Sequence, residues 1–171
     1  LESAKRELQR TLTISREEKA RLTASIHSLS LGFLMTDVYG EVLLFNHAVN
    51  DILSTMENAW TMQALMDKLG KIVDVQTRVR ESVQKVQEIK VDDIQYLEKW
   101  IRLYLTPIKM MEEDGRGIGV VILLEDVTEA KRLQQTRDEF FAVASHELRT
   151  PLTAIKGNSM LLRRLVPQID E

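Results

Sequence analysis

The residue types best suited to chemistry in this sequence are a histidine and its neighbours on a helical stretch. His146 is followed by Glu147, and a neutral imidazole is nucleophilic near pH 7. The pair also begins the pattern of a zinc-protease helix, which needs a second histidine four residues after the first. Position 150 is Thr150, so that pattern is incomplete and no metal site is expected here. The sequence therefore favours nucleophilic chemistry at His146 without a metal ion.

The apolar spacing around His146 predicts that its side chain is accessible. Ala144 and Leu148 belong to one apolar line of the predicted helix, and His146 lies two positions from each. This offset directs the imidazole away from the apolar line and toward solvent. A histidine within that line would be out of reach of a reaction partner.

Pro151 interrupts the hydrogen bonding of this helix close to His146. It has no N–H to donate to the carbonyl of Glu147, and its ring crowds that carbonyl, at a cost of about 3 kcal/mol in an unbent helix. We therefore expect a kink beside His146. The kink is either a fixed feature of shape or a bistable element that a signal could bias.

The residues around His146 form a contiguous motif. Positions 140–155 read Phe-Phe-Ala-Val-Ala-Ser-His-Glu-Leu-Arg-Thr-Pro-Leu-Thr-Ala-Ile. This segment closely resembles the H-box of bacterial sensor histidine kinases, whose core reads Ser-His-Glu-Leu-Arg-Thr-Pro-Leu. The resemblance covers a small part of the chain, but all eight core positions match.

The resemblance implies a role for each residue of the motif. His146 would be the phosphoacceptor, and Glu147 would accept or orient its proton. Thr150 lies one turn beyond His146, where its hydroxyl could place a water for phosphatase activity. Arg149 would contact phosphate or a partner's acidic pocket, or it forms an ordinary surface salt bridge. The alternative for Glu147 is a solvated helix carboxylate, and for His146 an exposed histidine without a role.

The resemblance also implies partners and cofactors. A sensor histidine kinase uses ATP and Mg²⁺ in a catalytic domain, which these 171 residues do not include, so we expect the fragment alone to be inactive. The expected partners are a second copy of the chain, the ATP-binding domain of the same kinase, and a response regulator that offers an aspartate. The rival interpretation is a non-catalytic dimerisation and sensing module. We expect no cofactor in the fragment, apart from a ligand of the sensor that the sequence does not identify.

Composition excludes several classes of function. The net charge of −3, with acids and bases interspersed, makes nucleic acid an unexpected partner. The absence of cysteine excludes disulfides, thiolate metal sites and flavin attachment to a thiol. Haem is not expected either, because His27 and His47 fall outside the long helix that carries the axial ligand in haem-binding sensor domains. No apolar run approaches the roughly 20 residues that span a bilayer, so we expect no membrane crossing here. The resemblance implies a cytoplasmic portion, where ATP and response regulators reside, and an upstream segment could anchor its parent in the inner membrane.

Residues 1–29 predict a signalling helix with a coiled-coil seam. The seam steps by alternating four and three residues, and Lys5, Ser15 and Lys19 interrupt it. A narrow stripe of this kind predicts a parallel partner helix, since a lone helix has nowhere to bury it. The alternative is a helix that folds back on its own domain.

Residues 30–128 predict a sensor domain. Two apolar runs, 31–35 and 42–45, indicate a hairpin with Asp37 and Gly40 in its turn. A short helix is predicted over 48–56, with Asn46 and Asn50 as candidate caps.

Two further helices are predicted between 59 and 86, with Gly70 between them, and three strands follow, over 89–96, 100–108 and 118–127. Residues 112–117 would form the last loop. This order, with the Glu125-Asp126-Val127-Thr128-Glu129 junction after it, resembles the PAS fold. Trp60, Trp100 and Tyr104 either border a pocket or simply pack.

Residues 129–171 predict a connector helix that runs into the phosphoacceptor helix, with Thr128 as its cap. The resemblance makes this the first helix of a dimeric four-helix bundle whose second helix is missing from the sequence. The predicted fold class is therefore α+β: a five-stranded antiparallel PAS-like sheet with short helices, flanked by an N-terminal coiled-coil helix and a long C-terminal helix. The predicted function is that of a sensor and phosphoacceptor fragment of a two-component histidine kinase.

Overall fold

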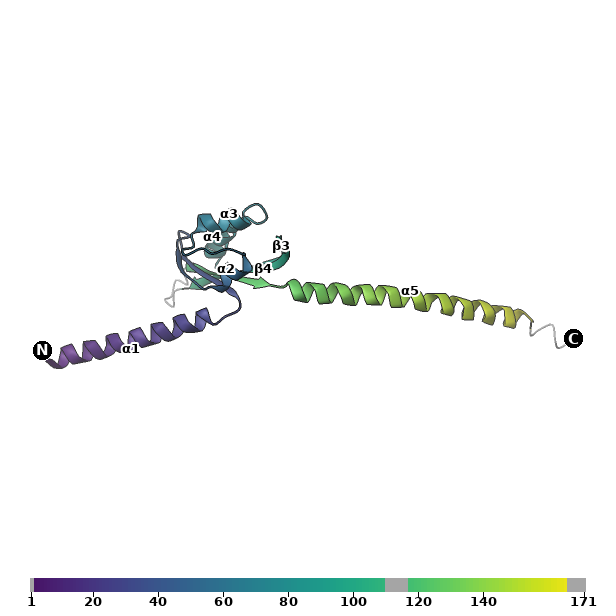
Figure 1. Cartoon of the computed structure of the whole chain (residues 1–171), viewed down its shortest axis with the longest axis horizontal. Helices are drawn as coiled ribbons and strands as arrows, with labels where there is room; N and C mark the ends of the chain where they lie inside the picture. The colour runs from purple at the N-terminus through teal and green to yellow at the C-terminus, as the bar shows by residue number, and fades with distance from the viewer. Residues whose placement is uncertain (1, 110–116, 166–171) are drawn as a thin grey trace. The chain divides into compact units, whose positions relative to one another are not determined.

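The computed structural model describes residues 2–109 and 117–165, and most of the predicted loop at 112–117 lies outside these ranges. The chain forms two units, Leu1–Thr128 and Glu129–Glu171. The first contains nearly all of the elements, and the second is a single helix (Figure 1). In chain order the elements are α1 Glu2–His27, β1 Gly32–Asp37, β2 Val42–Phe45, α2 Ala48–Ile52, α3 Met62–Leu69, α4 Val75–Lys85, β3 Ile89–Tyr96, β4 Lys99–Lys109, β5 Gly117–Asp126 and α5 Thr128–Leu165.

The sheet has five antiparallel strands in the order β2-β1-β5-β4-β3. The first and last strands of the domain are therefore neighbours, and β1 pairs with β5 along its whole length, from Gly32↔Leu124 to Asp37↔Gly119. On its other edge β5 pairs with β4. The predicted fold class, a five-stranded antiparallel sheet with short helices and a long C-terminal helix, is confirmed.

One face of the sheet packs against the short helices. Alternate residues of β1, β4 and β5 are buried, as period-two strands with one covered face require. Helices α2 and α4 contact the sheet, and α3 contacts α4. The core residues with no exposed surface include Leu34, Leu65, Leu69, Leu103, Leu105, Ile122 and Leu124.

The two helices predicted around Gly70 begin at side-chain caps. The Thr61 hydroxyl accepts a hydrogen bond of 3.1 Å from the N–H of Ala64 at the start of α3. The Asp74 carboxylate accepts one of 3.0 Å from the N–H of Thr77 at the start of α4. Bonds from Thr77 also lower the pKa of Asp74, because they favour its charged form.

The helix predicted over 48–56 is shorter than expected, and its predicted caps are wrong. Helix α2 ends at Ile52, and its N-cap is His47, whose side chain makes no capping bond. The Asn50 amide instead donates to the carbonyl of Glu57 and accepts from the indole N–H of Trp60. Both partners lie in the following loop. Together they satisfy the donor and the acceptor of this half-buried amide.

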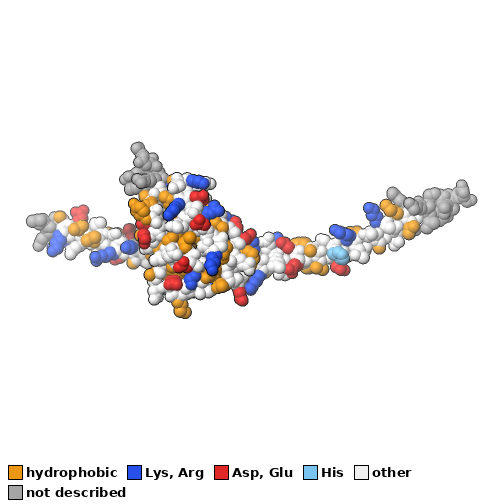
Figure 2. Space-filling view, turned by 90° about the horizontal axis from the view of Figure 1, so that it is seen from above, with side chains coloured by type: hydrophobic (Ala, Val, Ile, Leu, Met, Phe, Trp, Pro, Cys, Tyr) orange, Lys and Arg blue, Asp and Glu red, His pale blue; other side chains and the backbone are white. Residues whose placement is uncertain are grey.

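Helix α1 exposes its apolar stripe. Leu8 is 61% exposed and Leu22 66% exposed, so the described part of α1 is not folded back along its own domain. Figure 2 shows orange side chains scattered among charged ones on this helix. The predicted partner helix would cover them and stays a prediction.

The core predicts how single substitutions change stability. Leu103 is completely buried in the middle of β4, so Leu103→Ala should lower the free energy of unfolding by about 2–5 kcal/mol. Leu43 on β2 is 61% exposed and provides the control, since Leu43→Ala should change it by about 0.5 kcal/mol or less. Urea unfolding followed by circular dichroism measures both, and equal losses would contradict the assignment of the core.

Candidate functional site

Helix α5 carries all five candidate site residues on one uninterrupted stretch. It runs from Thr128 to Leu165 with Pro151 inside it, and Figure 1 draws the ribbon as continuous there. The Thr153 hydroxyl donates a 2.8 Å hydrogen bond to the carbonyl of Arg149, two residues to either side of the proline. The kink expected beside His146 stays a prediction.

The His146 imidazole is freely accessible. Its side chain is 77% exposed, and that of Glu147 is 78% exposed. The distance from Nδ1 of His146 to Oε1 of Glu147 is 4.0 Å, which is too long for a hydrogen bond. Direct proton exchange between the two side chains would require a rotamer change of either exposed side chain.

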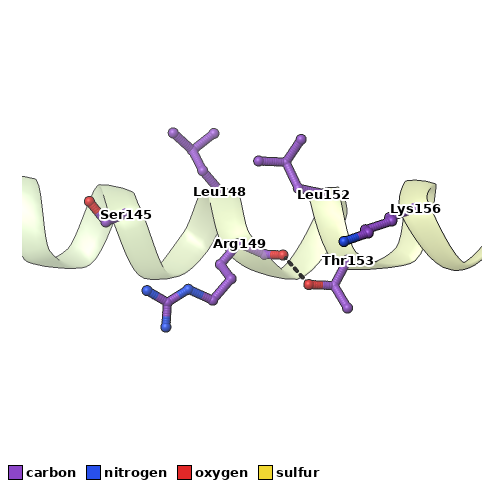
Figure 3. Close-up of a pocket in the computed structure, with 6 residues that line it drawn as sticks. All are labelled: Ser145, Leu148, Arg149, Leu152, Thr153 and Lys156. Atoms are coloured by element: carbon purple, nitrogen blue, oxygen red, sulfur yellow. Dashed lines mark hydrogen bonds between the residues drawn. The ribbon is translucent and has the colours of Figure 1, made fainter.

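Arg149 and Thr150 lie one turn beyond His146, because they follow it by three and four residues on the helix. Figure 3 shows the adjoining surface, where Leu148 and Leu152 project together and Arg149 extends to another side of the helix. Ser145, Thr153 and Lys156 complete this shallow surface. It offers two cationic side chains and two hydroxyls beside two leucines, a combination suited to an acidic protein partner.

Large apolar side chains are exposed along α5. Leu133, Phe140, Phe141, Leu148, Leu152 and Ile155 are each more than half exposed. An apolar surface of this extent marks an interaction site in a folded protein. His146 lies outside the predicted apolar line, so covering that line would leave the imidazole accessible.

The junction before α5 is held by hydrogen bonds to β4. The N–H of Val127 donates to the carbonyl of Trp100 at 2.8 Å, and the N–H of Trp100 donates to the Thr128 hydroxyl at 2.9 Å. The N–H and hydroxyl of Thr128 both donate to the carboxylate of Asp126. The predicted cap role of Thr128 is therefore corrected, since Asp126 accepts at the helix start and Thr128 fastens it to β4.

A polar network crosses the uncovered face of the sheet toward this junction. Arg102 on β4 binds Asp92 on β3 and, at 3.3 Å, Glu125 near the end of β5. Lys90 lies 2.9 Å from Asp92, and the Tyr104 hydroxyl donates to Glu125. Lys90 first and Arg102 second lower the pKa of Asp92, because they stabilise its charged form.

The aromatic residues proposed as pocket borders pack instead. Trp60 is buried and its N–H is bonded to Asn50, while Trp100 and Tyr104 are half-buried on the sheet. The hollow beside α2 is lined by other residues, among them His47 and Glu57. No ligand follows from these three positions.

The geometry of α5 agrees with a comparison of its sequence. The family model of the His Kinase A (phospho-acceptor) domain, HisKA, matches residues 136–171, which include His146 and the whole eight-residue core of the motif. Residues 136–171 are a HisKA segment.

Curated relatives extend the match over most of the chain. It is 32% identical over 142 residues to the sensor protein kinase WalK of Staphylococcus saprophyticus, covering 82% of this chain and 22% of the relative. It is 28% identical over 154 residues to the sensor histidine kinase WalK of Bacillus subtilis, covering 89% of this chain and 24% of the relative. The chain thus spans about a quarter of these kinases' length, and it joins a PAS-like module to a HisKA segment.

Solved structures support the fold of the first unit. The phage VqmA–DPO complex aligns with a TM-score of 0.51 at 17% identity, covering 74% of this chain and 62% of the other. At this identity the likeness concerns the fold alone.

Sequence reasoning found the HisKA residues but missed the polar contacts that hold the PAS-like module together. Asn46 was assigned to a helix cap, and Asp126 and Arg102 were given no separate role. The acidic junction motif contained a signal for Asp126, since an acid two residues before a threonine can bond its N–H. The pairing of Arg102 depends on strand register, which the sequence alone did not provide.

The lowered pKa of Asp92 predicts a measurable titration. We expect the Asp92 carboxyl to titrate below 3.8 in the folded chain and to move toward that value in Lys90→Met. Its contribution to stability is present above the unfolded-state pKa and is lost as pH falls through the folded one. Carbon-detected NMR measures the midpoint, and an unchanged midpoint in Lys90→Met would contradict the assigned cause.

The junction predicts a second effect. Thr128→Val keeps the shape of the side chain but removes its hydroxyl bonds, so the free energy of unfolding should fall by about 0.5–1.5 kcal/mol. Thr106 on β4 is exposed, and Thr106→Val should be close to neutral. Hydrogen exchange should also quicken around residues 126–131 in the first variant alone, and equal effects in both would remove Thr128 from this role.

Proposed function

We propose that this chain is the sensor and phosphoacceptor part of a histidine protein kinase. An imidazole nitrogen of His146 attacks the γ-phosphorus of ATP, a P–N bond forms, and the bond to the ADP oxygen breaks. An aspartate carboxylate of a response regulator then attacks the phosphorus and the P–N bond breaks. The match of residues 136–171 to HisKA carries this proposal, and the exposed imidazole supports it.

The remaining residues of the motif support the two transfers. The carboxylate of Glu147 lies 4.0 Å from the ring and stabilises the positive charge that develops there during attack. Arg149 forms no ion pair with any residue of the described part of the chain, so its guanidinium is available for phosphate or a regulator's carboxylates. Thr150 places a water for hydrolysis of the phosphorylated regulator, and Pro151 gives the helix a point of bending.

ATP and Mg²⁺ belong to a catalytic domain of the intact kinase. In the parts of the chain that the structure describes, no cluster of three acidic, histidine or cysteine side chains could hold a metal ion. In this proposal, the role of this chain in the first transfer is to present His146 to that domain.

A second copy of the chain is the partner that the exposed apolar surfaces favour. Residues 1–29 form a parallel coiled coil, residues 30–128 the PAS-like sensor, and residues 129–171 the connector and phosphoacceptor helix that enters a four-helix bundle. The exposed leucines of α1 and the exposed apolar line of α5 would both be buried in such a dimer. Input that reaches α1 passes through the sensor to α5.

The site works where ATP and response regulators meet, in the cytoplasm. Among residues 2–109 and 117–165, no helix is both long enough and apolar enough to cross a bilayer. In the proposed kinase, an upstream segment could provide an anchor in the inner membrane.

Substitution of the three histidines tests the phosphoacceptor assignment. In the intact kinase supplied with labelled ATP, His146→Gln should abolish acid-labile labelling, because the amide side chain of glutamine is not a nucleophile. His27→Gln and His47→Gln are matched controls, since these are the other two histidines of the chain and both lie outside α5. They should retain labelling.

Two outcomes would oppose the proposal. Labelling that survives in His146→Gln would remove His146 from its role. Absence of labelling in the wild-type kinase, with a dimer intact by native mass spectrometry, would favour the non-catalytic sensing module instead.

A further inference from the structure

Asn46 connects three segments of the first unit through one side-chain amide. The residue follows β2 and has no exposed surface. Its Oδ1 accepts a 2.9 Å hydrogen bond from the N–H of Phe33 in β1. Its Nδ2 donates to the carbonyl of Ile26 at 3.0 Å and to the carbonyl of Leu31 at 2.9 Å. Both N–H groups and the oxygen of the amide therefore have partners.

These partners lie at the join between α1 and the sheet. Ile26 is in the last turn of α1, where backbone carbonyls have no partner within the helix. Leu31 is in the linker, and Phe33 is in the first strand. A buried amide in this place bonds the helix end and the strand start together, so moving either one away breaks a hydrogen bond of a buried polar group. The carbonyl of Ile26 also accepts from the N–H of Leu29, and Nδ2 of Asn46 also donates to the carbonyl of Leu29 at 3.5 Å.

A second contact lies beside the first. The rings of His27, the last residue of α1, and His47, the N-cap of α2, have centroids 5.3 Å apart at an interplanar angle of 40°. The end of α1 thus meets consecutive residues, 46 and 47, on the sensor side. The rest of α1 is largely exposed, which concentrates its attachment at this point.

We propose that Asn46 is the coupling residue through which the position of α1 reaches the PAS-like module. A displacement of the end of α1 moves the amide, which is bonded to Ile26, and therefore moves Phe33, which is bonded to the same amide. Phe33 pairs with Leu123 of β5, and β5 leads into the junction at Asp126. The proposal deepens the proposed function and rests on it, because it gives the physical link between input at α1 and the strand that precedes the phosphoacceptor helix.

One substitution separates the two sides of this link. Asn46→Asp has nearly the same shape and keeps an oxygen to accept from Phe33. It replaces the Nδ2 donor with an oxygen that faces the carbonyls of Ile26 and Leu31. Opposed acceptors repel, so the bond to β1 is kept while the attachment of α1 is lost. Asn50→Asp is the matched control, because Asn50 also donates to a backbone carbonyl but has no bond to α1.

Spin-label distances report the attachment directly. The chain has no cysteine, so Arg21→Cys on α1 and Glu98→Cys between β3 and β4 provide one exposed label on each side of the joint. Dilution with unlabelled chain keeps the measured distances within one molecule. We expect a narrow distance distribution in the wild type, a broader one in Asn46→Asp, and an unchanged one in Asn50→Asp. Equal widths in all three chains, or equal broadening in both variants, would overturn the proposal.

A measurement without any variant covers the case in which Asn46→Asp fails to fold. The side-chain amide hydrogens of Asn46 should exchange with water at least about tenfold more slowly than those of the exposed Asn58. Similar exchange rates in the wild-type chain would overturn the proposal that hydrogen bonds of Asn46 attach α1 to the sheet. Neither experiment involves phosphorylation, so their failure would leave the assignment of His146 intact, and the loss of that assignment would leave the joint intact.

Discussion

The structure depends on the pairing of β5 between β1 and β4. This pairing places β5, the strand that precedes α5, next to β1, the strand that follows α1. The register between β1 and β5 is continuous from Gly32 to Asp37. A shift of β1 by one residue would turn its buried side chains to the opposite face of the sheet. The sheet therefore links the two ends of the sensor through a rigid element, and only short polar contacts are needed to attach a helix at each end.

Those attachments have the same chemistry at both ends. Asn46 joins the last turn of α1 to β1, and Asp126 with Thr128 joins the first turn of α5 to β4. Backbone groups at helix ends lack partners within the helix, so a side chain that supplies them fixes the helix at a defined residue. Apolar contacts would hold the helices less specifically, since they have no fixed direction.

The sequence predicted most of the fold because its strongest signals are local. Strand alternation in β4 and β5 and helical spacing in α4 follow from periodicity alone, and the contiguous motif around His146 identified the phosphoacceptor helix. The roles of Asn46, Asn50 and Thr128 were wrong for one shared reason. Each has a polar side chain that can serve a local cap but bonds elsewhere. Asn46 and Thr128 bond to residues far away in the sequence, Ile26 and Trp100, and Asn50 bonds to the loop that follows its helix.

The distribution of polar and apolar surface separates two tasks. Within one chain, polar bonds fix the helix ends to the sheet, whereas the apolar stripes of α1 and α5 remain exposed. A stripe without an intramolecular partner is stabilised by another chain, and a dimer would therefore align both helices while the joints set where each begins. A change in the packing of two α1 helices would act first on the hydrogen bonds of Asn46, because these bonds attach the end of the otherwise exposed α1 to the sheet. In the proposed dimer, α5 would receive the change through β5, and His146 would stay accessible because its position lies outside the line that the dimer would bury.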